Sequence, residues 1–68
     1  MNGFRTFKVF RSTSNEQVQK LTESQIIYAR SPEAASRFAK KWALELVEYG
    51  SEEIVTLRPE ASPQFPQI

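Results

Sequence analysis

Carboxylates are the side chains of this chain that come closest to a catalytic pattern. Glu52 and Glu53 are adjacent, and Glu60 follows them. Neighbouring residues of a strand point to opposite faces of a sheet, so the adjacent pair cannot act as acid and base on one substrate. The sequence has no cysteine, no histidine and only two glycines, which excludes thiol nucleophiles, imidazole bases and glycine-rich phosphate loops. We therefore expect no catalytic residues, no metal, no cofactor and no enzymatic activity.

Arginine and tyrosine side chains on an open sheet face are a second kind of candidate, because these residue types often dominate protein interfaces. Arg58 stands directly before Pro59, which keeps the backbone extended and fixes where the side chain emerges. The strand phases given below place it on the face turned away from the helix. We therefore expect a partner-binding surface with these contact residues: Arg58, Arg30, Tyr28, Thr56 and Lys8.

A basic helix face is the competing candidate. Arg37, Lys40 and Lys41, with Leu44 among them, fall on one side of the helix described next. Such a face can contact phosphates or an acidic protein surface. An ordinary solvated helix face has the same composition, and so few charges do not by themselves specify a partner.

The helix predicted for Pro32–Tyr49 is the element that organises the chain. Ser31 can cap it, and Pro32 fits the first helical position, where its missing N–H is not needed. Gly50 follows the last periodic residue and can take the left-handed conformation that closes a helix. The apolar residues recur at spacings of three and four, which is typical of a helix with one buried face: Ala35, Phe38, Ala39, Trp42, Leu46 and Tyr49.

Strands are predicted on both sides of the helix, at Phe4–Arg11, Gln25–Arg30 and Glu52–Arg58. The polar cluster after Arg11 ends the first strand, and Gln17–Ser24 is expected to form a long hairpin connection, either unpaired or with a few paired residues. Alternation along each strand predicts which side chains face the helix. Together with the helix stripe, these side chains form the predicted core: Phe7, Val9, Ile27, Ala35, Phe38, Trp42, Leu46, Val55 and Leu57.

The order strand–strand–helix–strand predicts an α+β fold. We expect a three-stranded antiparallel sheet in which the first two strands form a hairpin, the third lies beside the first, and the helix packs on one face. At 68 residues the chain is long enough for one small domain, predicted for residues 1–59. Residues 60–68 contain prolines and polar residues and are expected to form a flexible, extended or disordered tail.

Composition limits the partner and the compartment. The formal net charge is +1, so no global field directs the chain toward nucleic acid or membranes, and an electrostatic partner must meet a local patch. No apolar run is long enough to cross a membrane, and the N-terminus lacks the apolar core of a signal peptide. We expect a cytoplasmic binding protein.

The sheet face turned away from the helix is expected to interleave aromatic with basic side chains. Some domains stack single-stranded RNA on such a face, but the glycine-containing aromatic signature of that family is absent here. Three other arrangements have the same pattern: the tail folds back over this face, two copies pair there as a homodimer, or a protein partner docks there. We favour these three over RNA, and expect contact with nucleic acid only indirectly.

The segments Ile27-Tyr28-Ala29 and Glu53–Pro59, with the capped helix between them, resemble a family of small phage proteins. These are the inhibitors of host RNA polymerase made by podoviruses that replace host transcription with their own. The family is similar in length and has the strand–strand–helix–strand layout. A pair of arginines lies on the outer face of its last strand. Arg58 matches the second of them, and Thr56 stands in the place of the first.

The resemblance implies that this chain binds a bacterial host protein. The family binds the jaw region of the polymerase β′ subunit and blocks promoter opening. Its first strand carries an acidic strip, whereas this chain has Arg5, Lys8 and Arg11 there. The function expected from the resemblance is inhibition of a bacterial host macromolecular machine, with RNA polymerase as the target. The alternatives are an anti-CRISPR-type inhibitor of a defence complex, a nucleic-acid-binding accessory domain, and a structural homodimer.

Overall fold

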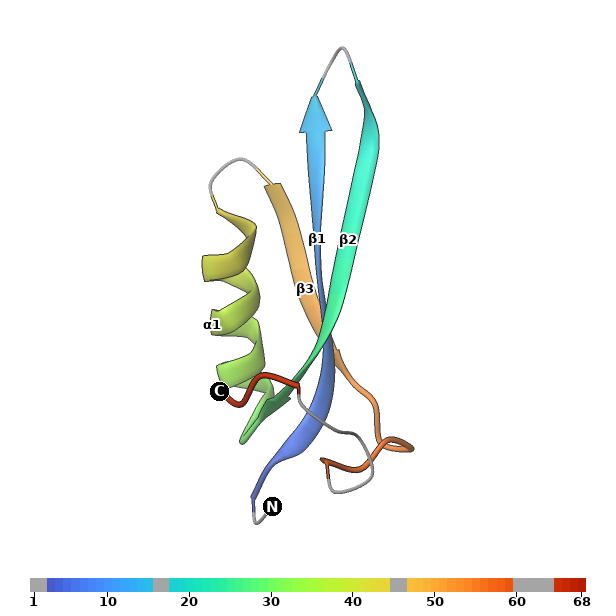
Figure 1. Ribbon diagram of the computed structural model, residues 1–68. Helices are drawn as coiled ribbons and strands as arrows, with labels where there is room; N and C mark the ends of the chain where they lie inside the picture. The colour runs from blue at the N-terminus through green and yellow to red at the C-terminus, as the bar shows by residue number, and fades with distance from the viewer. Residues whose placement is uncertain (1–2, 16–17, 45–46, 60–64) are drawn as a thin grey trace.

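Three strands and one helix follow one another in the order β1 (Arg5–Asn15), β2 (Val18–Ala29), α1 (Pro32–Ala43) and β3 (Val47–Glu53). The computed structural model describes residues 3–15, 18–44, 47–59 and 65–68. The strands form one antiparallel sheet in the order β2-β1-β3, and α1 packs against one face of it (Figure 1). The predicted α+β architecture, with the third strand beside the first, is confirmed.

β1 and β2 form a long hairpin that reaches beyond α1 and β3 (Figure 1). β3 pairs only with residues 7–13 of β1, and the molecule is elongated, with extents of 44 × 18 × 17 Å. The connection predicted at Gln17–Ser24 is wrong from Val18 onward, because β2 already begins there. Polar side chains support this pairing: the hydroxyls of Ser12 and Thr22 share a hydrogen bond of 3.1 Å across the hairpin.

The predicted start of α1 is confirmed, and its predicted end is wrong. Ser31 has an extended backbone, and its Oγ accepts a hydrogen bond of 3.1 Å from the amide of Ala34, while Pro32 opens the helix. The helix ends at Ala43, and Leu44 follows with a φ of +66°. Leucine rarely adopts this left-handed region, so the surrounding structure must impose the early end.

Gly50 does not cap the helix as predicted, because it belongs to β3 and lies opposite Phe10. The Phe10 ring covers it so closely that a Cβ on residue 50 would lie 2.3 Å from the Phe10 Cζ. Glycine is therefore needed here by strand packing and not by a helix cap. The third strand begins before the predicted range Glu52–Arg58 and shares only its first two residues, because the chain turns after Glu53.

The core lies between α1 and the helix-facing side of the sheet. The sheet contributes the larger buried side chains and the helix contributes two alanines. The buried cluster consists of Phe7, Val9, Ile27, Ala29, Ala35 and Ala39. Ala34, Phe38 and Trp42 pack against this cluster while only partly buried, and the rings of Phe38 and Trp42 stack with centroids 6.5 Å apart. Small alanines at the contact let the helix approach the sheet, which leaves the two large rings at its flank.

The predicted core is confirmed for Phe7, Val9, Ile27 and Ala35. Phe38 and Trp42 contribute from the edge of the core, and Leu57 is half-buried outside it. The prediction that Val55 is buried is wrong, because it lies in the turn after β3 and is 78% exposed. The prediction for Leu46 falls outside the described residues.

Candidate partner-binding surfaces

A pocket of about 290 Å³ lies where the chain leaves β3 and passes the start of β1. The amide of Ile54 donates a hydrogen bond of 2.9 Å to the Thr6 carbonyl, which extends the β1–β3 ladder by one residue. A turn follows, in which the Leu57 amide donates to the Ile54 carbonyl at 3.3 Å. The lining combines apolar and charged side chains: Phe4, Arg5, Thr6, Glu53, Ile54, Val55, Leu57, Arg58 and Pro59.

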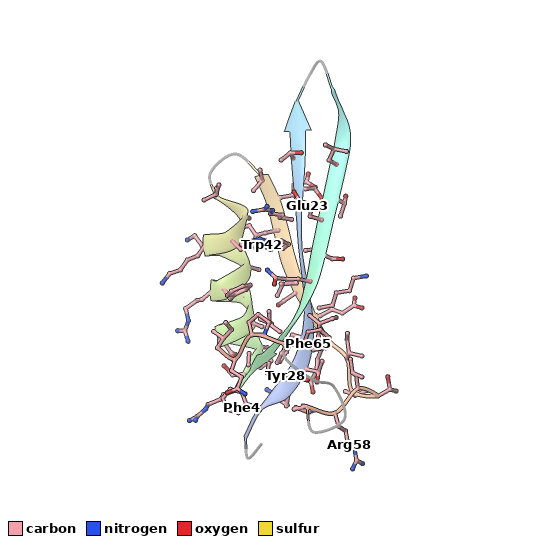
Figure 2. All side chains as sticks on the ribbon, viewed as in Figure 1. Phe4, Glu23, Tyr28, Trp42, Arg58 and Phe65 are labelled. Carbon is pink, nitrogen blue, oxygen red and sulfur yellow. The ribbon has the colours of Figure 1, made fainter. Side chains whose placement is uncertain are left out.

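The two arginines of this pocket differ in whether they form an ion pair. Arg5 forms an ion pair with Glu53, with Nη1 and Oε1 3.1 Å apart. Arg58 is exposed, points away from the body of the molecule (Figure 2), and forms no ion pair with any residue in the described ranges. Thr6 is buried, and its hydroxyl has no hydrogen-bond partner among the described residues. Within the described ranges, the pocket thus combines the unpaired guanidinium of Arg58 with a lining that is partly apolar.

Four of the five predicted contact residues are exposed, but not all of them lie where the strand phases put them. Arg58 and Thr56 lie in the segment after β3 and not on a strand, so the expected strand geometry before Pro59 is wrong. Lys8 lies on β1, directly opposite Glu52 of β3. Arg30 stacks over the Phe4 ring at 5.0 Å, and Phe4 lines the pocket that Arg58 also lines. Arg30 and Arg58 therefore lie at the same end of the molecule, both near Phe4.

The prediction that Tyr28 is a partner contact is wrong, because this residue is only 1% exposed and cannot serve as a surface contact in this conformation. Residues 65–68 run alongside it in a parallel bridge between Tyr28 and Gln67. The Tyr28 amide donates to the Pro66 carbonyl at 2.8 Å, and the Ile68 amide donates to the Tyr28 carbonyl at 2.7 Å. The Phe65 ring meets the Tyr28 ring edge-on, with centroids 5.8 Å apart (Figure 2).

The same tyrosine is held from a second direction. Its hydroxyl donates a hydrogen bond of 3.1 Å to the Pro59 carbonyl, next to Arg58. The returning C-terminal segment pairs with the free edge of β2 at this end of the sheet (Figure 1). The turn that carries Arg58 is thus fixed to β2 through Tyr28.

The competing helix residues are all exposed. Arg37, Lys40 and Lys41 lie on the solvent side of α1, and Leu44 at its end is 73% exposed. A second concavity, of about 510 Å³, lies between this side of α1 and residue 68. The structure therefore contains two separate candidate surfaces, the pocket beside Arg58 and the groove along α1.

Arg11 is the residue that sequence reasoning missed. Its guanidinium lies 4.4 Å from the centre of the Trp42 ring and donates a hydrogen bond to the Trp42 carbonyl, at the C-terminal end of α1. It also pairs with Glu23 on β2, with Nη2 and Oε2 3.3 Å apart. Strand alternation could have predicted this position, because Arg11 is in phase with the helix-facing residues Phe7 and Val9.

Sites for a metal or a membrane span are absent from the parts of the chain that the structure describes. No group of three or more histidine, cysteine, aspartate or glutamate side chains there could hold a metal ion. No helix in the same ranges has the length and apolar character needed to cross a membrane. Comparison with protein-family models, curated proteins and solved structures finds no match to this chain.

Proposed function

We propose that this chain is a small phage-type binding protein that acts in the bacterial cytoplasm by occupying a surface of a host protein complex. RNA polymerase is the target to test first, because the sequence resemblance is to its phage-encoded inhibitors. In this proposal the chain performs no chemistry of its own and blocks the host complex sterically.

The observation that carries the proposal is the setting of Arg58. Its guanidinium is exposed and free of ion pairs among the described residues, and it stands at a pocket with an apolar part. Arginine beside an apolar recess is a common composition of interface hot spots. The turn that carries it is held by Tyr28, so less conformational entropy is lost when a partner binds.

The fold supports the same reading. The strand–strand–helix–strand order is the layout of the inhibitors that the sequence resembles. Arg58 matches one of their arginines in sequence, although here it follows β3 instead of lying on it. Arg30 reaches the same end of the molecule through its stacking on Phe4. A partner surface centred on Arg58 would therefore also include Phe4 and Arg30.

Transcription from a promoter by purified bacterial RNA polymerase tests the proposal directly. The wild-type chain should bind the polymerase and lower the yield of transcripts when it is added before promoter opening. Arg58→Ala should weaken binding by at least about tenfold, the effect of losing a hot-spot arginine. Lys40→Ala is the matched control, because it removes an exposed cation from α1 and leaves the pocket intact.

The outcomes test two points separately: whether RNA polymerase is the target, and which surface of the chain binds it. A wild-type chain that neither binds the polymerase nor changes transcription would remove RNA polymerase as the target. Binding that survives Arg58→Ala but falls in Lys40→Ala/Lys41→Ala would move the surface to the helix. Circular dichroism of each variant checks that the fold is unchanged.

A further inference from the structure

The groove along α1 combines a cationic rim with an apolar floor. Arg30, Arg37 and Lys41 form the rim, with Lys40 next to them in sequence. The floor is made by the side chains of Ala34 and Phe38 together with Ile68, which the C-terminal segment brings beside the start of the helix (Figure 1). Its volume is about 510 Å³, enough to hold one large side chain of a partner.

Arg30 of the rim stacks on the Phe4 ring, whereas the other two rim cations form no ion pair with the residues that the structure describes. Arg5 and Arg11 form ion pairs with glutamates, but no carboxylate in the described ranges pairs with Arg37, Lys40 or Lys41. Arg37 and Lys41 are four residues apart, so they stand on one helix face about 6 Å apart along the axis. Like charges at this spacing destabilise a helix slightly. Lys40 and Lys41 lie in the last turn of α1, where cations are favourable to the helix dipole, but Arg30 and Arg37 lie outside that turn.

The apolar floor of the groove favours an anionic partner that also carries an apolar side chain. Phe38 is only partly buried, with one ring face stacked on Trp42, and Ile68 is 40% exposed. We propose that this groove binds an acidic protein segment that inserts a large apolar side chain against Phe38 and Ile68. Its carboxylates would lie against Arg30, Arg37 and Lys41. This surface meets the surface around Arg58 at Arg30, but its other residues are different and it does not depend on the function proposed above.

Nucleic acid fits the groove less well. Phosphates bind solvated cations and need no apolar recess, and affinity for a duplex grows with the number of phosphates neutralised. The formal net charge of the chain is +1, and β3 carries the exposed residues Glu48, Glu52 and Glu53. These carboxylates would repel a phosphate backbone that extends beyond the groove.

A labelled peptide provides the test. The probe is a fluorescein-labelled synthetic peptide of alternating aspartate and glutamate with a central Phe-Leu pair, titrated with the full-length protein at low ionic strength. We expect a Kd on the order of 100 μM or tighter, weakening as salt is added. Backbone amide NMR shifts should change at Ala34, Arg37, Phe38, Lys41 and Ile68.

Two matched comparisons identify the groove. Arg37→Glu/Lys41→Glu should weaken peptide binding by about tenfold or more. Lys8→Glu/Arg58→Glu, with the same change in net charge on other surfaces, should change it by less than about twofold. A peptide whose Phe-Leu pair is replaced by serines should bind about tenfold more weakly, because the apolar floor is then unused.

Several results would overturn the proposal. One is equal binding of the serine peptide, which would reduce the groove to a general cationic surface. Another is a single-stranded oligonucleotide that binds more tightly than the peptide through the same amides, which would assign the groove to nucleic acid. Shift changes confined to other residues would also refute it, as would a concentration-dependent dimer that buries these residues.

Discussion

The guanidinium of Arg11 lies 4.4 Å from the centre of the Trp42 ring and also donates a hydrogen bond to the Trp42 carbonyl. That carbonyl belongs to the last turn of α1, where no further helical amide is available to bind it. The same guanidinium pairs with Glu23 of β2. One side chain from the central strand therefore closes the helix and ties it to the hairpin.

Arg11→Ala should lower the free energy of unfolding by about 2 kcal/mol, since it removes a cation–π contact and a charged hydrogen bond to the helix end. Urea denaturation followed by circular dichroism measures this. Arg11→Lys keeps the charge but not the planar fork, so we expect it to recover only part of the loss. Full stability in the alanine variant would show that solvent satisfies the Trp42 carbonyl equally well.

Thr6→Val should raise the free energy of unfolding by about 1 kcal/mol, because the Thr6 hydroxyl is buried with no hydrogen-bond partner among the described residues. Ser12→Ala is the matched control, since Ser12 is equally buried from solvent but hydrogen-bonded to Thr22. It should destabilise the fold by about 1 kcal/mol. The same denaturation experiment compares both. Destabilisation by Thr6→Val would mean that the hydroxyl has a partner in solution.

Gly50→Ala should destabilise the protein by about 1–2 kcal/mol, because the new Cβ collides with the Phe10 ring. In a Phe10→Ala background the same change should be neutral or stabilising, since alanine is favoured over glycine within a strand once space exists. Thermal unfolding of the four proteins gives the coupling between the two positions. Equal effects of Gly50→Ala in both backgrounds would show that the ring does not constrain residue 50.

Phe65→Ala should release the C-terminal segment from β2, because it removes the ring that packs edge-on against Tyr28. Amide hydrogen exchange should then accelerate at Tyr28 and Ile68, whose amides bond across this contact. Amides in the middle of β1 should keep their protection. Phe65→Leu, which retains apolar volume, should behave nearly as wild type, and unchanged exchange at Tyr28 in the alanine variant would contradict the prediction.

Local patterns in the sequence were sufficient for the start of the helix and for the phase of the first two strands. Ser31 and Pro32 act within one turn of each other, and the alternation of Phe7 with Val9 needs no distant information. The end of the helix was not predictable in this way. Gly50 has the local signature of a helix cap, and only its pairing with Phe10 on another strand makes it a strand residue.

The candidate site shows the same division. The exposure of Arg58 and Arg30 follows from their charge, which makes burial unfavourable. The burial of Tyr28 depends on residues 65–68, a segment whose composition alone predicted no fixed position. Arg11 was in phase with core residues. The carbonyl of Trp42 accepts its hydrogen bond because the helix ends nearby and supplies no amide for that carbonyl.

The central position of β1 bears on the order in which the chain folds. Only residues 16 and 17 separate β1 from β2, whereas β3 reaches β1 only after β2 and α1 have been spanned. Closing the shorter loop loses less entropy, and hairpins form in about 1–10 μs. We therefore expect the hairpin to form before β3 docks. A substitution at Gly50 should then mainly accelerate unfolding, whereas one at Ile27, paired with Phe7 inside the hairpin, should slow folding.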